Sequence, residues 1–382
     1  MWYVGLDWAD THHDVLVLDE AGRRVGSRRF VHSHQGLNEL KQFVLSIAGH
    51  PENLACIVET SHGLLIAFLL EAGFPVYPVN PKTVDRRRSA AGAKTDAIDA
   101  YVLAKIGRSD LADLRRLQAD SALVVELKTL TRDQDALIQS QTRLVNQLTA
   151  CLKASYPVAL QLFSKLHQPS TLHFLQTYPT PQAAQAASVE QIAALLKSTR
   201  HPTPVKTAQH IWHMLQQPYL QADAVTTRTK ARLMLALVAQ LVPLIEQIAA
   251  YDKEISTLFL THADQDVWSS LPGAGKRLAP RLLAEWGDDR SRYAKAHKRF
   301  ACVKPLRNAL QQFAWQSTQH EAWALAYYQR KRAQGKTHSM ALRALANVWV
   351  RIIYRMWVNQ TSYQTATFEA AQQAHAPRQQ IA

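Results

Sequence analysis

The first third of the chain alternates short apolar runs with polar turns. Apolar runs at 3–8, 13–19 and 24–31 predict three short strands, and a Glu-Ala-Gly turn separates the second from the third. The runs follow one another with little chain between them. We therefore expect the chain to begin with a three-stranded meander.

Strands and helices alternate after the meander. LACIVET (54–60) predicts a fourth strand, and LLIAFLLEAG (64–73) predicts a helix whose Gly73 lies where a helix C-cap would. FPVYPV (74–79) then predicts a fifth strand. Because alternation of strands with helices favours parallel pairing, the pattern indicates an α/β domain.

Apolar residues then recur every seven positions along two later stretches. The first series contains Leu123, Leu130, Leu137 and Leu144, with Cys151 in the next place and Gln134 and Gln141 as polar interruptions. The second series contains Leu241, Ile248 and Ile255. This spacing predicts two long helices that pack as a coiled coil. The sequence leaves open whether they pair within the chain or across a dimer.

Prolines interrupt the region between the two series. They are Pro157, Pro169, Pro179, Pro181, Pro202, Pro204 and Pro218. Because proline ends or starts a helix, we expect short helices joined by turns over 157–227. We find no candidate chemistry there.

The charge balance adds a class of partner to this picture. The chain has 382 residues, with 44 Lys and Arg against 30 acids, a formal charge of +14. Such an excess attracts polyanions, of which nucleic acid is the usual one, although a basic surface without a dedicated partner is the alternative. Three scattered cysteines fit a reducing cytoplasm. We expect a soluble protein without a signal peptide or an apolar run long enough to cross a bilayer.

Four acids lie where the predicted elements end or begin. Thr95 is a natural N-cap, and the helix that it opens carries Asp96 and Asp99 on one face of its first turn. Asp7 and Glu59 stand at the polar ends of two predicted strands. Carboxylates that converge in this way suit one or two Mg²⁺ ions at a phosphodiester. The alternative is that the two helix acids only stabilise the helix dipole.

Basic segments supply candidate contacts for phosphates. A predicted loop over 84–94 carries Arg86, Arg87 and Arg88, which a solvated loop would explain equally well. The turn at 271–288 is similar to a helix-hairpin-helix, in which Gly273 and Gly275 let the backbone approach a phosphate and Lys276 and Arg277 add charge. A plain helix connection is the alternative there.

The C-terminal tail alternates aromatic residues with bases. The bases include Arg330, Lys331, Arg332, Arg343, Arg351 and Arg355. These are the better candidates for nucleic-acid contact. Trp349 shares its neighbourhood with apolar residues at helical spacing, so we expect it in the core.

Several of these motifs, in this order, resemble the insertion-sequence transposases with an Asp-Glu-Asp-Asp RuvC-like domain. This family includes a pilin-gene invertase and recombinases guided by a bridge RNA. The matching segments are GLDWAD (5–10), VETSHGLL (58–65), FPVYPVNPKTVDRRR (74–88), GAKTDAIDA (92–100), LPGAGKRLAPRLLAEWGD (271–288) and the tail over 323–357.

The resemblance implies three domains. These are an RNase H-like (RuvC-like) catalytic domain over 1–116, a helical coiled-coil region over 117–262, and a helical C-terminal transposase domain over 263–382 with the helix-hairpin-helix-like turn. It also implies that Asp7, Glu59, Asp96 and Asp99 bind Mg²⁺, and that a structured RNA pairs with the ends of the insertion sequence and with target DNA. A dimer or tetramer is expected.

One segment departs from the family. Its members carry a Ser-Gly pair after the Leu-Leu-Ala-Glu-Xaa-Gly-Asp motif, and that serine joins covalently to DNA. Here SRYAKA (291–296) runs directly into HKRFACVKPLRNAL (297–310), with no Ser-Gly pair between Asp288 and Leu310. Ser291, Ser317 and Ser339 match other family positions. No nucleophilic serine is therefore assigned.

The function that the resemblance implies is DNA strand cleavage and exchange by the transposase of an insertion sequence. The missing serine segment leaves two alternatives open. The chain could be a metal-dependent DNA endonuclease in which the acids do all the cutting. It could instead be a non-catalytic repressor that binds DNA or acts with a guide RNA.

Overall fold

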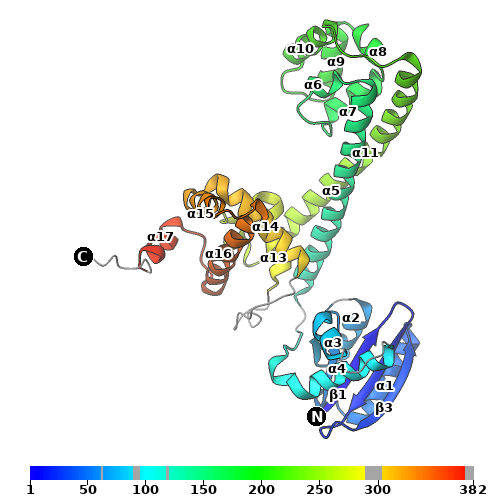
Figure 1. The fold of residues 1–382 in the computed structure, drawn as a ribbon, viewed down its shortest axis with the longest axis vertical. Coiled ribbons are helices and arrows are strands. Elements are labelled where there is room, and N and C mark those ends of the chain that lie inside the picture. Colours follow the sequence, from blue (N-terminus) through cyan, green and yellow to red (C-terminus); the bar gives the residue numbers. More distant parts are fainter. Residues whose placement is uncertain (62, 89–94, 118–119, 289–302, 375–382) are drawn as a thin grey trace. The chain divides into compact units, whose positions relative to one another are not determined.

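The computed structural model describes residues 1–382 except 62, 89–94, 118–119, 289–302 and 375–382 (Figure 1). Over the described residues the chain forms two compact units. One contains Met1–Ser121 with Asp288–Lys304, and the other contains Ala122–Gly287 with Pro305–Ala382. The second unit contains most residues of the predicted second and third domains. The predicted loop residues Gly92, Ala93 and Lys94, and Ser291, lie outside the described residues.

A five-stranded mixed sheet forms the centre of the first unit. Its strands are β1 (Trp2–Trp8), β2 (His12–Leu18), β3 (Arg24–Val31), β4 (Leu54–Val58) and β5 (Val76–Pro78). The order across the sheet is β3-β2-β1-β4-β5. The first three strands pair antiparallel, whereas β4 pairs parallel with β1 and with β5. All five strands lie where the apolar runs predicted them.

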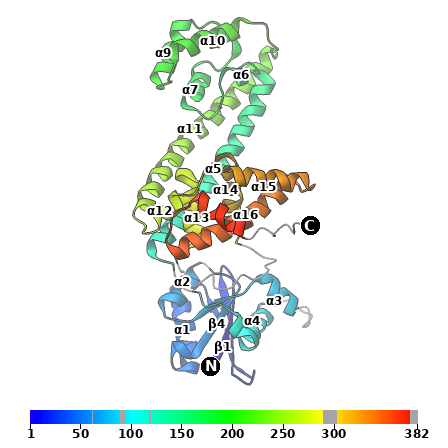
Figure 2. The same ribbon diagram turned by 90° about the vertical axis from the view of Figure 1, so that its left-hand side faces the viewer.

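Helices cover both faces of this sheet (Figure 2). The helices α1 (His34–Ala48) and α2 (Leu64–Glu71) pack on one face, over a core that includes Leu6, Leu40 and Leu69. The helices α3 (Pro81–Arg88) and α4 (Asp96–Asp110) lie on the other face, over a core that includes Ile57 and Leu103. The single-turn helices η1 (Pro51–Asn53) and η2 (Leu111–Asp113) complete this unit.

Two predictions for this unit need correction. Helix α1 was not predicted. Its apolar residues Leu37, Leu40 and Val44 do recur at helical spacing, but they lie inside a polar segment that follows three strands. The basic stretch that starts at Val84 is helix α3 as far as Arg88, not a loop. Val84 of this helix is fully buried, so the short basic segment has one apolar residue that packs in the core.

Two long helices organise the second unit. The helices α5 (Ala122–Ser155) and α11 (Ala224–Leu260) lie side by side over much of their length (Figure 1). Five short helices cover one end of this pair: α6 (Ala159–Leu162), α7 (Pro169–Thr177), α8 (Pro181–Gln185), α9 (Val189–Ser198) and α10 (Pro204–Gln216). Three of these begin at a proline. This is expected, because proline lacks the backbone N–H that a residue inside a helix donates, and the first turn does not need that donor.

The two heptad series differ in burial. Leu241, Ile248 and Ile255 of α11 are all buried. On α5, Leu127 and Leu148 are buried, but Leu123, Leu130, Leu137 and Leu144 are only half-buried. The polar residues Thr131 and Gln134 of α5 are buried as well, and the Gln134 amide donates to Asp252 Oδ1 of α11 at 2.8 Å. The predicted leucine series thus lies beside the internal contact of α5 rather than at its centre.

Helix α11 also bears on the predicted absence of a membrane segment. By length and composition it is apolar enough to cross a bilayer, so the prediction that the chain holds no such run was wrong. Its buried face packs on α5 within the chain. A core helix of a soluble protein passes the same test, so this feature is weak evidence for a membrane span.

The remaining helices pack around tryptophans. They are α12 (Gln265–Ser269), α13 (Gly275–Trp286), α14 (Lys304–His320), α15 (Ala322–Ala333), α16 (His338–Asn359) and α17 (Thr365–Ala374). Trp268, Trp286, Trp349 and Trp357 are each at most 1% exposed, so the prediction that Trp349 lies in the core is confirmed. Helix α13 is tied to α5 by a bidentate ion pair, in which Arg132 donates to buried Glu285 at 2.7 and 2.9 Å.

Candidate metal centre

The register of the sheet brings three carboxylates to one area. Residues Trp8 to His12 form a tight hairpin, closed by the Ala9 amide donating to the His12 carbonyl at 2.9 Å. This hairpin sets Asp7 of β1 opposite Asp14 of β2. On the other side of β1, Leu6 pairs with Val58 of β4, so Asp7 and Glu59 follow in step at neighbouring strand ends. Both predicted strand-end acids therefore reach the same edge.

Gly5 lets helix α4 bring the other two acids to this edge. A Cβ built on Gly5 would lie 1.8 Å from the Ala100 carbonyl oxygen and 2.5 Å from the Ala104 nitrogen. Helix α4 therefore crosses β1 in backbone contact at the residue two before Asp7. Successive residues alternate faces along a strand, so Gly5 and Asp7 face α4 together. Asp99 precedes the contact residue Ala100 and is only 5% exposed.

The start of α4 has the predicted cap. Thr95 has extended backbone angles, and its hydroxyl accepts from the Ile98 amide at 3.3 Å. Asp96 and Asp99 occupy the first turn, where the helix dipole favours negative charge. The prediction of the helix start and its cap is confirmed. The two acids differ in environment, because Asp96 is exposed and Asp99 is buried.

The pKa of Asp7 depends on the other acids at this edge. Burial raises the pKa of the Asp7 carboxyl from 3.8 to about 7, and the negative charges of Asp99, Glu59, Asp96 and Asp14 add to the rise in that order. Removing a carboxylate from water and placing it among like charges both disfavour its ionised form. The charge of a cation at this edge would favour the ionised form of Asp7 and so oppose the rise of its pKa.

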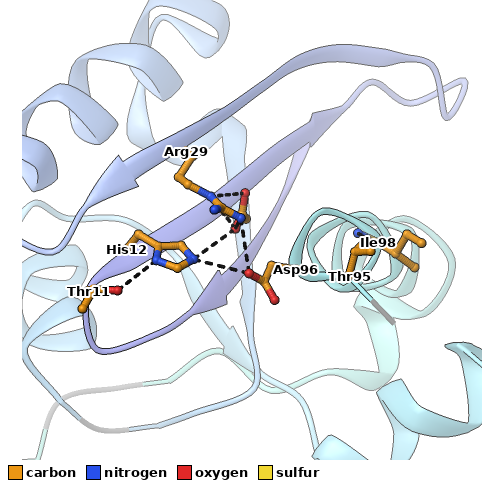
Figure 3. Close-up of polar contacts among 7 residues, drawn as sticks. Thr11, His12, Arg29, Thr95, Asp96 and Ile98 are labelled. Atoms are coloured by element: carbon orange, nitrogen blue, oxygen red, sulfur yellow. Dashed lines mark hydrogen bonds and ion pairs between the residues drawn. The ribbon is translucent and has the colours of Figure 1, made fainter. Parts of the chain in front are cut away.

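A second set of contacts holds Asp96 (Figure 3). Asp96 Oδ2 lies 3.3 Å from His12 Nε2 and accepts from Arg29 Nη2 at 3.2 Å. Arg29 also donates to both Asp14 oxygens, at 2.8 to 3.2 Å. His12, Asp14 and Asp96 offer ligand atoms that lie within 4.8 Å of one another. The exposed Asp96 side chain therefore turns toward β2 and β3, which explains why Asp99 affects Asp7 more strongly.

Sequence reasoning missed His12, Asp14 and Arg29. Asp14 of β2 pairs with Asp7 of β1 on one side and with Arg29 of β3 on the other. Asp7, Asp14 and Arg29 therefore form one row across the three strands. The hairpin register contains this signal. Pairing the predicted first and second strands through the four residues 9–12 places Asp14 opposite Asp7.

The four predicted acids carry donor atoms of the kind that magnesium accepts. Asp7, Glu59, Asp96 and Asp99 offer carboxylate oxygens, which are the ligands that this hard cation prefers. Asp14 adds further oxygens at the same edge. His12 is the exception, because an imidazole favours zinc or other transition metals.

The residues of the predicted phosphate-binding turn have different surroundings. Gly273 and Gly275 have φ of +78° and +57°, which only glycine adopts readily. A Cβ on Gly273 would lie 2.5 Å from His320 and 3.2 Å from the Gln316 backbone, so this glycine is required by its contact with α14. Gly275 faces open space. Lys276 is exposed, whereas Arg277 donates to Asp252 at 2.8 Å.

The other candidate residues are placed as follows. Arg87 of α3 donates to Asp110 at the end of α4. Ser317 is fully buried, donates to the Ala314 carbonyl and accepts from the Trp349 indole, both at 2.8 Å. This environment excludes Ser317 as an accessible nucleophile. Ser339 is exposed in the first turn of α16.

Comparison with known proteins identifies the class. Residues 4–157 match the profile of the DEDD transposases of IS110 elements. The transposase assigned to the IS117 mini-circle of Streptomyces coelicolor is 31% identical over 379 residues, which cover 90% of this chain and 91% of that protein. The 42 kDa protein of insertion element IS900 from Mycobacterium paratuberculosis is 27% identical, with 97% and 98% covered. The 43.6 kDa protein of IS110 from Streptomyces coelicolor is 25% identical, with 95% of each chain covered.

These matches place the chain among insertion-sequence transposases, a class of enzymes that process DNA. Within that class, it belongs to the IS110 family.

Proposed function

We propose that this transposase binds Mg²⁺ through Asp7, Glu59, Asp96 and Asp99 and uses that site to cleave DNA at the ends of its insertion sequence. The observation that carries the proposal is the geometry of the sheet and helix α4. Asp7 and Glu59 follow paired residues at neighbouring strand ends, and α4 is in backbone contact with Gly5, two residues before Asp7. The raised pKa of Asp7, to which all three of the other acids contribute, supports the proposal. We propose further that this unit is RNase H-like, and its mixed five-stranded sheet supports that proposal.

The bound metal would supply Lewis-acid stabilisation of the phosphodiester oxygens. The residues of this chain would supply the remaining parts of the reaction. Glu59 and Asp7 hold their carboxylates on a rigid sheet, and Asp99 is fixed by the contact between α4 and β1. Asp96 is the one exposed acid of the four, so it would meet the substrate side of the site.

Nucleic-acid partners follow from the family and the charge of +14. We propose that the partners are DNA and a structured guide RNA, that the protein works in the cytoplasm, and that it assembles as a dimer or tetramer. The half-buried series at Leu123, Leu130, Leu137 and Leu144 would form a coiled-coil contact between protomers.

The missing Ser-Gly pair favours a second candidate function. Of the two matched serines that the structure describes, Ser317 is fully buried, and Ser339 is exposed on α16 in the unit that does not hold the four acids. The four acids could then act alone as a metal-dependent nuclease, or the protein could bind DNA as a repressor. We expect no covalent serine intermediate, since such a step requires a positioned hydroxyl.

The test incubates the protein with Mg²⁺, insertion-sequence DNA and RNA transcribed from the same element. Denaturing gels then separate nicked DNA from DNA that migrates with protein. Nicking that is lost in Asp96→Asn and retained in Asp10→Asn would support the metal site, because Asp10 is an exposed acid in the same segment. Wild-type processing by Asp96→Asn would refute the site. A protein-linked product lost in Ser291→Ala would show that the serine route persists.

A further inference from the structure

A pocket of about 300 Å³ lies within the second unit, between α5, α13 and α14. Its lining includes Gln134 of α5, Arg277 and Arg281 of α13, and Trp315 with two glutamines of α14. The volume is at the lower end of the ~300–1,000 Å³ usual for sites that bind small ligands. The size and the mixed lining suit one planar polar group.

Trp315 supplies a fixed aromatic surface in this pocket. Trp315 is 40% exposed. The indole makes edge contacts with Tyr328 and His338, with ring centroids 5.8 and 5.3 Å away. The Tyr328 hydroxyl lies 2.8 Å from His338 Nδ1, which holds these two rings together. Packing therefore fixes the indole while part of it remains open to a ligand.

The charges in the pocket are already compensated. Arg277 donates to Asp252 through Nε at 2.8 Å, and Arg281 donates to both oxygens of Asp135 at 3.1 Å. Arg281 is only 12% exposed, so this pair is shielded from water. A free phosphate would have to compete with these carboxylates for both guanidinium groups. The pocket therefore favours a neutral ligand over an anion.

Amide groups line the same pocket. Gln312 and Gln316 project from α14 one turn apart, and Gln312 Oε1 accepts from Arg281 at 3.1 Å. Gln134 is 6% exposed and is oriented by its bond to Asp252. A glutamine side chain offers both a donor and an acceptor, which is the pattern that the edge of a nucleobase presents.

We propose that this pocket receives one unstacked nucleobase, which stacks on Trp315 and bonds through its edge to Gln312 and Gln316. An aromatic face, amide groups and compensated charge are together the chemistry by which proteins hold single bases of unpaired strands. The proposal rests on the proposed function, because the base would belong to a bound nucleic acid. It adds a contact made outside the unit that holds the carboxylates.

The test compares two single strands of equal length and charge, one with thymine at each position and one abasic throughout. Binding to the full-length protein is measured by fluorescence anisotropy in EDTA, with DNA and RNA versions of the base-containing strand as separate arms. The variants are Trp315→Leu, Trp315→Phe and the control Trp212→Leu. Trp212 is 38% exposed on α10, a match for Trp315 in residue type and exposure.

The expected result is that the wild type prefers the thymine strand over the abasic strand by about tenfold, as one stacked base gives. Trp315→Leu should abolish that preference and leave affinity for the abasic strand unchanged, while Trp315→Phe and Trp212→Leu keep it. The base-containing strand, DNA or RNA, whose affinity falls more in Trp315→Leu identifies which nucleic acid supplies the base. Equal binding of both strands by the wild type, or a preference that survives Trp315→Leu, would overturn the pocket proposal alone. Absence of binding to either strand would overturn it together with the proposed function.

Discussion

Asp7 occupies the most costly position for a charge in the candidate metal centre. Its pKa lies near 7 in the folded protein, against 3.8 for the ordinary carboxyl, because of burial and of the acids around it. The folded state therefore binds more protons than the unfolded state between these two pH values. Stability from this residue falls as pH rises from about 4 to 7, and it stays low above that range. An ionised carboxylate that lowers the stability of the folded state in this way fits a functional role.

The first prediction is that Asp7→Asn stabilises the metal-free protein at high pH. The amide keeps the shape of the side chain but carries no charge, so its gain over wild type should be on the order of 2–4 kcal/mol at pH 8 and near zero at pH 4. Thermal unfolding in EDTA at both pH values measures this difference. Asp10→Asn serves as the control and should show no such gain. A variant as stable as wild type at pH 8 would show that Asp7 is not destabilised in the fold.

At the scale of elements, the contact between β1 and α4 decides whether the acids meet. Ala100, Ala104 and Gly107 form the contacting face of α4, and Gly5 is the residue of β1 beneath it. A Cβ on Gly107 would lie 2.2 Å from Ile57 of β4, so the helix is close to two strands at once. Small residues on both sides therefore set the depth of α4, and with it the positions of Asp96 and Asp99.

We accordingly predict that Gly5→Ala lifts α4 away from the sheet. Its Cβ would overlap helix backbone, which has no rotamer to change, so a loss of roughly 3 kcal/mol or more in unfolding free energy is expected. Denaturant unfolding measures the loss. Gly26→Ala is the comparison, because its added atom would meet only the ends of the Phe43 and Ile47 side chains. Equal losses in the two variants would argue against a special role for the Gly5 contact.

The long helix α5 carries a face that the internal contact does not fully cover. Leu137 is half-buried there, beside the fully buried positions that face α11. Leu137→Glu should convert an assembled form to a smaller species, since a charge in an apolar seam is costly to bury. Light scattering coupled to size exclusion measures the mass. Leu233→Glu, on exposed α11 surface, should leave the mass unchanged. An unaltered mass in Leu137→Glu would assign this face to solvent.

Local patterns predicted much of the first unit but not its assembly. All five strands and the Thr95 cap followed from runs of apolar residues and from one capping residue. The row from Asp7 through Asp14 to Arg29 depends on strand register, which a single run does not contain. The same limit applies to α5. Its seven-residue repeat predicted the helix, but it did not predict which face of the helix packs on α11. Arg277 and Asp252 lie 25 positions apart, so their pairing required the packed helices.

At the scale of the whole molecule, a basic chain carries a local cluster of acids. The charge of +14 favours approach of nucleic acid from any side, whereas the carboxylates at the sheet edge would repel a phosphodiester. A divalent cation resolves that opposition, because it satisfies the carboxylates and attracts the phosphate. Metal and nucleic acid must therefore act at the same edge, and the metal must bind the protein on its own.

Direct titration of Mg²⁺ into the full-length protein by calorimetry tests this requirement without depending on catalysis. We expect saturable binding that is tighter at pH 8 than at pH 6, because protons on Asp7 compete with the metal. Asp96→Asn should weaken binding by at least about tenfold, and Asp10→Asn should leave it unchanged. Binding that is independent of pH and equal in wild type and Asp96→Asn, or no binding by wild type at all, would contradict the proposed metal centre.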